Sequence, residues 1–334
     1  MFKGKKILII GGTGTIGRAL AKRLFLEGPA VIRIFSRDEF KQSEMAEEMK
    51  EHKNIRFLLG DIRDLARVER AMEDIDIVFH TAALKQVPAC EYNPFEAVKT
   101  NVIGTQNVID ASLKMGVKKV IFTSTDKTIG PTNTYGATKL LAERLVASAD
   151  YYKGSKDITF AAVRFGNVMG SRGSVIPLFK KQIIETQSIS VTDMEMSRFM
   201  MTQSQAIELL LRCGERARGG EVFILKMPIV KLQDLAEVVI EEVCRTNEID
   251  PSSIIINRMG FRPGEKMYEE LMTLEESKYA IEFNDMFAVH HMIHDSLGDY
   301  GDGWKAELKT YSSHEGMPIT KQEIRDLILA EELV

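Results

Sequence analysis

The sequence predicts an α/β fold with a smaller second lobe at its C-terminal end, and three observations support this prediction. Short apolar runs rich in β-branched residues alternate with helical segments through the first half of the chain. A glycine-rich turn follows the first of these runs and opens a helix. The alternation becomes irregular after about residue 170. Because continuous apolar strands that alternate with helices are typical of a sheet buried on both faces, we expect a doubly wound parallel sheet of the Rossmann type.

The expected elements of the first part follow this alternation in order. Strands are expected at KKILIIGG, VIRIFSR, DIVFHTAA, KKVIFTST and FAAVRFGNV. Helices are expected at IGRALAKRLFLEG, NVIGTQNVIDASLKMG and TYGATKLLAERLVASA. We therefore assign residues 1–170 to the first domain and residues 171–334 mainly to the smaller lobe.

The smaller lobe is expected to mix helices with a few strands. GSRGSVIPLFKKQI predicts a loop and a helix, KLQDLAEVVIEEV an amphipathic helix, and GFRPGEKMYEELM a turn that leads into a further helix. The run EVFILKM, residues 221–227, predicts a strand that is a candidate to return to the large sheet. The boundary between the two parts is therefore not expected to be clean.

Composition and charge argue against several classes of protein. The chain has 334 residues, 44% of them hydrophobic and 28% charged, as is ordinary for a globular protein with a sizeable core. Lys and Arg total 44 against 48 for Asp and Glu, and this net charge of -4 supports neither a nucleic-acid nor a membrane partner. The run in MFKGKKILIIGG is too short for a signal peptide or a membrane span. The scattered Cys90, Cys213 and Cys244 predict no disulfide framework, so we expect a cytoplasmic protein.

The turn GGTGTIG predicts a site for the pyrophosphate of a dinucleotide. Its glycines are spaced G-x-x-G-x-x-G between a strand and a helix, so the backbone can turn tightly and approach a phosphate at the helix N-terminus. A purely structural turn is the alternative interpretation. The residues expected to contact the cofactor here are Gly11, Thr13, Gly14, Thr15, Ile16 and Gly17.

The end of the second strand favours NADP over NAD. In FSRDEFKQ, Ser36, Arg37 and Lys41 offer donors to a 2′-phosphate, whereas Asp38 is the kind of residue that an NAD site presents to the ribose. A solvated loop arginine is the alternative interpretation of Arg37. Further cofactor contacts are expected at Asp61 and Ile62 in LLGDIRD and at the small residues Ala82 and Ala83 in HTAALKQVP.

Tyr135 and Lys139 form a candidate redox pair. They stand at positions i and i+4, so they share one face of the expected helix. A phenol is a poor base at its ordinary pKa of about 10, and a nearby ammonium together with an oxidised nicotinamide favours the phenolate. Thr125, at the end of the strand before the helix, is expected to hydrogen-bond the substrate hydroxyl.

At this point the chain resembles the extended short-chain dehydrogenase/reductase superfamily. Within it, STDKTIGPTNTYGATK, TAALKQVPACEYNP, RFGNVMGSRGSVIPLFKKQI and GFRPGEKMYEELM are similar to the inverting UDP-N-acetylglucosamine 4,6-dehydratases, and the likeness extends to SRDEFKQSEM and YSSH. The resemblance implies a hydro-lyase that uses a recycled NADP and begins the pathway to pseudaminic acid. It also implies a homo-oligomer, with a hexamer as one candidate form.

The resemblance gives Asp126 and Lys127 a chemical purpose. Oxidation at C4 of the sugar makes the C5 hydrogen acidic, after which a base must remove it and an acid must protonate the leaving hydroxyl at C6. The family pattern implies that Lys127 acts at C5 and Asp126 assists at C6, with Lys127 neutralised by desolvation near other cations. An ion pair that only caps the turn is the alternative. The resemblance places further contacts at Val168 for the cofactor and at Lys85, Asn167, Arg198 and Arg262 for the substrate.

Two further questions stay open in the sequence. HHMIH contains His290, His291 and His294, but no carboxylate or cysteine completes a recognisable metal site nearby, and we expect no metal.

The competing functions are a UDP-sugar 4-epimerase or C5-epimerase of the same superfamily, and a non-catalytic NADP-binding protein. The epimerase has no need of Lys127, and the presence of Thr125, Tyr135 and Lys139 argues against the binding protein.

Overall fold

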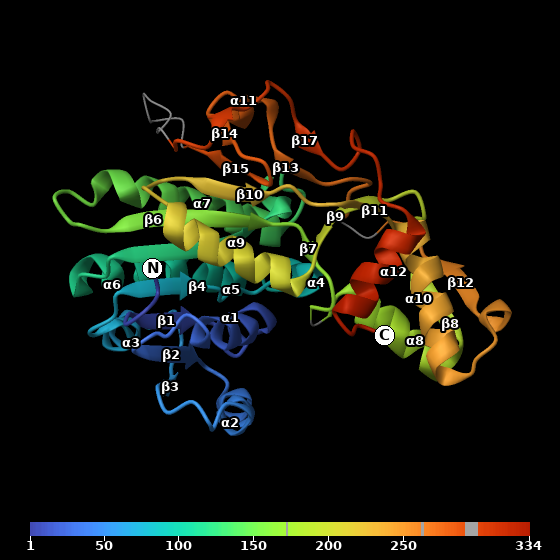
Figure 1. Ribbon diagram of the computed structural model, residues 1–334, viewed down its shortest axis with the longest axis horizontal. Helices are drawn as coiled ribbons and strands as arrows, with labels where there is room; N and C mark the ends of the chain where they lie inside the picture. Colours follow the sequence, from blue (N-terminus) through green and yellow to red (C-terminus); the bar gives the residue numbers. More distant parts are fainter. Residues whose placement is uncertain (172, 262–263, 291–299) are drawn as a thin grey trace.

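Seven parallel strands form the centre of the molecule in the order β3-β2-β1-β4-β5-β6-β10. The computed structural model describes residues 1–171, 173–261, 264–290 and 300–334, and all statements below concern these residues (Figure 1). The parallel strands are β1 (Lys6–Ile10), β2 (Val31–Ser36), β3 (Ile55–Leu59), β4 (Ile77–His80), β5 (Lys119–Thr125), β6 (Thr159–Phe165) and β10 (Val222–Leu225). The expected doubly wound, Rossmann-type sheet is therefore confirmed.

Three antiparallel strands extend this sheet beyond β10. They are β15 (Met286–Val289), β14 (Ala280–Glu282) and β16 (Trp304–Lys305). The strand expected at 221–227 thus lies in the large sheet beside β6, and later segments of the chain join it there.

Helices cover both faces of the sheet. Helix α1 packs against α9 in one layer, and α3, α6 and α7 pack successively in the other. Their N-termini are specified locally, since the Asn133 side chain accepts from Gly136 at the start of α7 and Thr202 forms a capping box with Gln205 at the start of α9. The elements between the strands are α1 (Thr15–Phe25), α2 (Glu39–Glu48), α3 (Leu65–Met72), α4 (Val87–Tyr92), α5 (Pro94–Ala97), the π-helix η1 (Val98–Ile103), α6 (Gly104–Met115), η2 (Asp126–Thr128), α7 (Thr134–Tyr152) and α9 (Gln203–Arg216).

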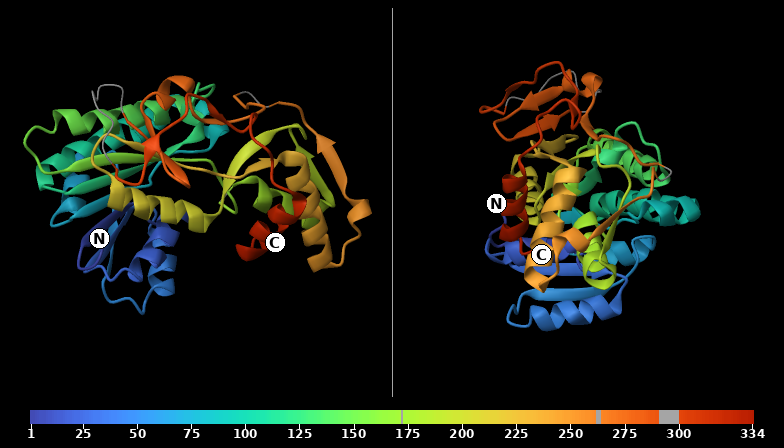
Figure 2. Two further views of the ribbon diagram at one scale, coloured as in Figure 1. Left: turned by 45° about the horizontal axis from the view of Figure 1, so that its top comes forward. Right: turned by 90° about the vertical axis from the view of Figure 1, so that its right-hand side faces the viewer.

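The smaller lobe has its own apolar core and lies beside the large sheet, as the left view in Figure 2 shows. Helix α10 packs against α8 and α12, and the pair β8-β12 flanks them. The short sheet β11-β9-β7 lies between the lobe and the large sheet, and the pair β13-β17 lies above β10 in the view of Figure 1, next to β14 and β15. These elements are β7 (Asn167–Val168), α8 (Val175–Thr186), β8 (Ser188–Val191), β9 (Ser197–Met201), β11 (Ile229–Lys231), α10 (Leu232–Asn247), η3 (Pro251–Ser253), β12 (Ile255–Arg258), β13 (Glu270–Met272), α11 (Leu274–Ser277), β17 (Tyr311–Ser312) and α12 (Lys321–Ala330).

The helix expected near the end of GFRPGEKMYEELM is wrong. Residues 270–272 form β13, which pairs with β17, and only the four-residue α11 follows. Leu271 and Met272 are fully buried, so the tertiary pairing and the core contacts override the helical pattern of this short segment. Within the described residues, no helix is long and apolar enough to cross a membrane.

The topology places the site-forming segments at one edge of the sheet. The chain leaves β1 toward β2 and β3, then returns to β4 on the other side of β1, so the strand order reverses between β1 and β4. Ile10 pairs with His80 at the ends of β1 and β4, and Thr125 pairs with Phe165 at the ends of β5 and β6. Because His80 pairs with Phe122, β5 and β6 extend beyond β1 and β4 at the same edge of the sheet. Open α/β sheets bind ligands outside this edge, at the point where the strand order reverses.

Candidate active site

The glycine turn is built for a close backbone approach. A Cβ on Gly17 would lie 2.6 Å from the Gly11 carbonyl oxygen, and one on Gly11 would lie 2.7 Å from the Ala82 amide nitrogen. Gly11 also has a φ of +81°, which favours glycine. Gly14 caps α1 without a side-chain hydrogen bond in the described structure, so the first amides of this helix point outward as donors. These features fit the pyrophosphate of a dinucleotide.

Residues at the end of β2 offer cationic groups beside this turn. Arg37 is 58% exposed, and its guanidinium lies 4.0 Å from Asp61. Asp38 caps α2 by accepting from the Lys41 amide, and its carboxylate also pairs with the Lys41 ammonium at 2.5 Å. The Ser36 hydroxyl accepts a hydrogen bond from Gln42. The Asp38 carboxylate is thus paired within α2, whereas the Arg37 guanidinium is largely exposed.

The other predicted cofactor residues lie around the same edge. Asp61 accepts two hydrogen bonds from the Arg63 guanidinium, which lower the pKa of its carboxyl. Ile62 is buried against Gly104, and Ala82 approaches Gly11. The remaining predicted positions are Thr13 on the turn, Thr15 and Ile16 at the start of α1, Ala83 after β4, and Val168 in β7.

Thr125, Tyr135 and Lys139 come together where β5 ends and α7 begins. Thr125 is the last residue of β5, and Tyr135 is the second residue of α7. The Lys139 ammonium is buried, donates to the Thr123 carbonyl, and lies 3.8 Å from the centre of the Phe122 ring. Tyr135 and Lys139 share one face of α7 as expected.

Burial governs the pKa values of this pair. It lowers the pKa of Lys139 to about 7, against the opposing charge of Glu143. It raises the pKa of Tyr135 to about 12, while the charge of Lys127 and the interaction with the Thr125 hydroxyl act in the lowering direction. The expected lowering of the phenol pKa by Lys139 is not found, because Lys139 faces Thr123 and Lys127 is the cation that acts on Tyr135.

Asp126 and Lys127 form an ion pair in η2, directly after β5. The Lys127 ammonium lies 3.0 Å from Asp126 Oδ1, which also accepts from the Thr125 hydroxyl at 2.8 Å. Asp126 is fully buried, and its Oδ2 atom has no hydrogen-bond partner among the described residues. The Lys127 side chain is 27% exposed and faces a cavity.

A third charged group, Glu269, completes this cluster. Its Oε1 atom lies 3.5 Å from the Lys127 ammonium and 3.6 Å from Arg198 Nε. Burial alone would lower the pKa of Lys127, but Asp126 and Glu269 raise it above its ordinary value. The expectation that Lys127 stands among cations is therefore wrong, because its two nearest charged neighbours are carboxylates.

The predicted substrate residues surround one cavity of about 270 Å³. Lys85, Asn167 and Arg198 line it together with Lys127 and Glu269. A second cavity of about 230 Å³ shares Asn167 and Arg198 and extends into the smaller lobe along α8. The remaining substrate prediction, Arg262, lies outside the described residues.

Two site residues were missed from the sequence. Glu269 stands in a quoted motif, but its partners lie far away along the chain, so no local pattern indicates the contact. Asn101 is buried in the π-helix η1, where it accepts from the Leu84 amide and donates to the Leu84 carbonyl and the Thr138 hydroxyl. Asn101 thereby fixes the segment after β4 against α7, and single-turn π-helices frequently mark functional sites.

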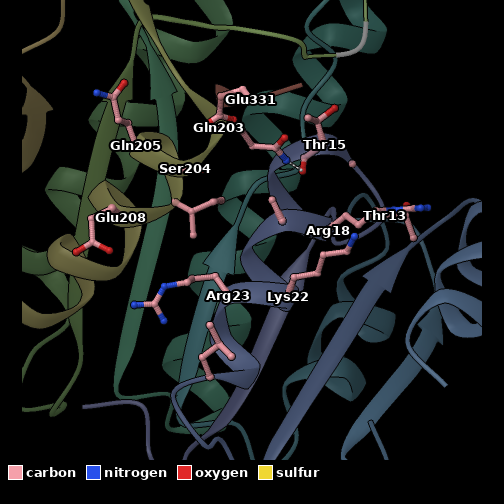
Figure 3. A pocket seen from close by; sticks show the side chains of 14 residues that line it. Thr13, Thr15, Arg18, Lys22, Arg23, Gln203, Ser204, Gln205, Glu208 and Glu331 are labelled. Atoms are coloured by element: carbon pink, nitrogen blue, oxygen red, sulfur yellow. Dashed lines mark hydrogen bonds between the residues drawn. The ribbon is translucent and has the colours of Figure 1, made fainter. Parts of the chain in front are cut away.

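A larger hollow of about 930 Å³ lies between α1 and α9 (Figure 3). Thr13 and Thr15 line it, and Gln203 donates to the Thr15 carbonyl. Arg18 and Lys22 line it but both pair with Glu48. The predicted catalytic residues do not line this hollow, so the chemistry is assigned to the cavity at Lys127.

The histidines of HHMIH give no indication of a metal centre in the described part of the chain. No group of three His, Cys, Asp or Glu residues gathers there in a form that could hold a metal ion. His290 is buried and lies close to the Tyr300 ring, whereas His291 and His294 lie outside the described residues.

The fold, the glycine turn and the Tyr135–Lys139 helix define an enzyme of the extended short-chain dehydrogenase/reductase superfamily. The chain belongs to the family described as polysaccharide biosynthesis protein, whose model matches residues 7–291. It is similar to the crystal structure of Pen from Bacillus thuringiensis, with 53% identity, a TM-score of 0.95, and coverage of 100% of this chain and 99% of that one.

Curated relatives carry two kinds of enzyme name. A UDP-N-acetylglucosamine 4,6-dehydratase (inverting) from Campylobacter jejuni is 40% identical, over 98% of both chains. A UDP-glucose 4-epimerase from Rickettsia rickettsii is 37% identical, over 100% of this chain and 98% of that one. A protein from Methanocaldococcus jannaschii, 47% identical over 98% of this chain and 96% of that one, is named only as an uncharacterized membrane protein.

Proposed function

We propose that the protein is an inverting UDP-N-acetylglucosamine 4,6-dehydratase that uses a recycled NADP. The single observation that carries the proposal is the Asp126–Lys127 pair at 3.0 Å, with Lys127 lining the cavity next to Tyr135. An enzyme that only moves hydride at C4 needs Tyr135 and Lys139, whereas dehydration needs two further proton-transfer groups. The 40% identical relatives named as inverting dehydratases support the same reading.

Oxidation at C4 uses the groups at the start of α7. Tyr135 takes the proton of the C4 hydroxyl in its phenolate form, which the charges of Lys127 and of a bound oxidised nicotinamide favour, and Thr125 holds that hydroxyl in place. A bound NADP would supply the hydride acceptor for C4 and the hydride donor for C6, so the overall reaction would have no net change of redox state. The residues that would hold the cofactor are those of the glycine turn and the end of β2, with Arg37 at the 2′-phosphate.

Elimination uses the pair in η2. Transfer of one proton from Lys127 Nζ to Asp126 Oδ1, across their 3.0 Å contact, converts the ion pair into an amine and a carboxylic acid. The amine then removes the proton from C5 while the acid protonates the oxygen on C6, which leaves as water. The pair returns to ammonium and carboxylate, so its protons balance. Inversion requires the new C5 proton to arrive at the opposite face of the sugar.

The substrate is expected to occupy the two joined cavities. Arg198, shared by both, is suited to a diphosphate, and Lys85 and Asn167 stand where the sugar would lie. By its likeness to the dehydratases we assign the product, UDP-2-acetamido-2,6-dideoxy-β-L-arabino-hexos-4-ulose, to the start of pseudaminic acid synthesis. We also propose that the chain works as a homo-oligomer, with a hexamer as the form to test.

The second candidate is a UDP-sugar 4-epimerase, favoured by the names of the 37% identical relatives. The two functions separate by the mass of the product. Incubation with UDP-N-acetylglucosamine should give a product lighter by one water molecule, with inverted C5 by NMR and, in D₂O, deuterium at C5. A product of unchanged mass would establish the epimerase, and no turnover would leave a nucleotide-binding protein.

Tyr135→Phe tests the oxidation step. The change removes the phenol and keeps the ring, so folding should survive while turnover falls by at least about 100-fold, as is typical of a lost general base. Turnover near the wild-type rate would remove Tyr135 from the mechanism.

A further inference from the structure

Glu269 lies beside Lys127, but the mechanism proposed above gives it no role. Its carboxylate is 6% exposed, and its Oε1 atom lies between the Lys127 ammonium and Arg198 Nε at 3.5 and 3.6 Å. Both contacts are longer than hydrogen bonds. The backbone is fixed from both sides, because the Glu269 amide donates to the Ser313 hydroxyl at 3.0 Å and the Ser313 amide donates to the Glu269 carbonyl at 2.9 Å.

Arg198 is likewise fixed, and it links Glu269 to the substrate cavity. Its guanidinium donates to the carbonyls of Ser197 and Lys266 at 2.7 and 2.8 Å, and its side chain lines both cavities. An anionic group that enters the cavity therefore meets the Arg198 guanidinium, whose positive charge already acts on the Glu269 carboxylate.

We propose that Glu269 is a positioning residue that couples the binding of a diphosphate-bearing substrate at Arg198 to the loss of one of the two carboxylate charges that hold Lys127 as an ammonium ion. The inference rests on the proposed function, because it explains how a lysine between two carboxylates becomes a base. Before substrate binds, the Glu269 carboxylate and Asp126 together hold Lys127 as an ammonium ion.

The charges around Glu269 make this switch physically reasonable. Burial and the Asp126 charge raise the pKa of Glu269, while Lys127, Arg198 and Lys266 act in the opposite direction. A diphosphate at Arg198 offsets the nearest guanidinium charge and adds negative potential. The pKa of Glu269 then rises further, and the carboxylate takes up a proton from solvent through the cavity.

A neutral Glu269 weakens the hold on the Lys127 ammonium. One anion remains beside Lys127, at 3.0 Å, and transfer of the lysine proton to that anion, Asp126, cancels both charges. The steps balance, with one proton taken from solvent by Glu269 and one moved inside the pair. The base is therefore formed when substrate is present and stays protonated when it is not.

The test measures proton uptake upon binding, without turnover. UDP-N-acetylglucosamine is titrated into the Tyr135→Phe protein by calorimetry at pH 7, in two buffers with different ionisation enthalpies. This sugar nucleotide has no group of its own that titrates near neutrality, so proton uptake comes from the protein. We expect a net uptake of up to one proton per site in Tyr135→Phe, and essentially none in Tyr135→Phe/Glu269→Gln.

Tyr135→Phe/Glu265→Gln is the matched control, because Glu265 lines the same cavity. This control should keep the uptake. Binding without proton uptake in Tyr135→Phe overturns the inference and leaves the proposed function standing, and it does so even if the double variants fail to fold. Equal uptake with and without Glu269 overturns it too. Absence of binding overturns both the inference and the proposed substrate.

Discussion

Two clusters of buried charges meet the end of β5, and their contacts differ. The inner cluster consists of Glu143, Arg164 and Glu276. Arg164 is fully buried, and its guanidinium lies 2.6 Å from Glu143 and 3.0 Å from Glu276, with a further 2.6 Å hydrogen bond to the Leu271 carbonyl. Glu276 also accepts from the Thr273 amide in a capping box.

The outer cluster consists of Asp126, Lys127, Arg198 and Glu269. It also combines carboxylates with cations, but the contacts of Glu269 are 3.5 and 3.6 Å, and Asp126 Oδ2 has no hydrogen-bond partner among the described residues. The cluster also borders a cavity.

The difference separates a scaffold from a chemical site. Charges that are closely paired on all sides resist any change of protonation, whereas loosely paired charges beside a cavity respond to a ligand. Both clusters tie the segment around β13 and α11 to the region of β5 and α7. The same end of the sheet therefore contains a rigid ion network and an adjustable one.

The largest expected effect is on the chemistry of the outer cluster. Lys127→Ala should reduce elimination by about 10²–10⁴-fold, because the base at C5 is lost. Oxidation at C4 needs Tyr135, so substrate should still reduce the bound cofactor, more slowly because the charge of Lys127 no longer lowers the pKa of Tyr135, and the cofactor then stays reduced. Absorbance of the reduced nicotinamide in a single turnover and deuterium at C5 in D₂O measure the two steps separately.

Lys266→Ala is the control for this experiment. Lys266 lines the same cavity but donates to the Ile129 carbonyl, away from the Asp126–Lys127 pair. Its loss should leave the ratio of elimination to oxidation unchanged. If Lys127→Ala eliminates at the normal rate with normal exchange at C5, Lys127 is a turn residue and Asp126 becomes the first candidate base.

Substitutions in the inner cluster should lower the free energy of unfolding. Arg164→Met leaves Glu143 and Glu276 buried without their shared cation, and breaking a buried pair in this way costs about 3–5 kcal/mol. Denaturant unfolding measures the loss. Arg245→Met, at an arginine whose side chain is 68% exposed and pairs with Glu242, should cost at most about 1 kcal/mol. Similar losses in the two variants would contradict the scaffold role.

A smaller effect distinguishes the clusters by the pH dependence of stability. Burial tends to raise the pKa of Glu276, but Arg164 lowers it below 4.5, so its ionised form stabilises the fold above that pH and the contribution is lost as pH falls. Burial and Asp126 raise the pKa of Glu269, so the folded state binds more protons and stability falls as pH rises above 4.5.

Glu276→Gln and Glu269→Gln should therefore change the stability curve in opposite ways. Compared with Glu276→Gln, the wild type should gain free energy of unfolding as pH rises toward about 4.5. Compared with Glu269→Gln, the wild type should lose free energy of unfolding as pH rises above about 4.5. The free energy of unfolding between pH 3 and 8 measures both. Slopes of the same sign would mean that the two carboxylates have equivalent environments.

The sequence predicts the parallel sheet and the edge where the site lies, because these follow from local apolar patterns and a glycine turn. It also places Tyr135, Lys139, Asp126 and Lys127 correctly at the end of β5 and the start of α7. Their functional roles remain predictions.

Long-range contacts explain what the sequence could not predict. The surroundings of Lys127 depend on Glu269, which reaches it only because β13 pairs with β17. The same pairing turns an expected helix into a strand. The direction of the Lys139 side chain, toward Thr123, likewise depends on the packing of α7 against β5.

The smallest expected effect concerns the exposed charges at the end of β2, which belong to neither cluster. Arg37 is 58% exposed and lies 4.0 Å from Asp61, so Arg37→Ala should change the free energy of unfolding by less than about 1 kcal/mol. Arg37 should matter more for binding, because a charge-assisted hydrogen bond from Arg37 to a ligand phosphate contributes about 1.5–3 kcal/mol to the binding free energy. The variant should therefore bind NADP at least about tenfold more weakly while its affinity for NAD stays close to wild type.

Arg63→Ala is the control for this change, since Arg63 holds Asp61 through two hydrogen bonds and should affect both nucleotides alike. Nucleotide extracted from denatured wild-type protein gives an independent measurement, and NADP(H) is expected because a recycled cofactor has no need to leave. Extraction of NAD(H) alone would contradict the assignment of Arg37. The preference of the enzyme would then follow Asp38, and its pairing with Lys41 would have to open to admit a ribose.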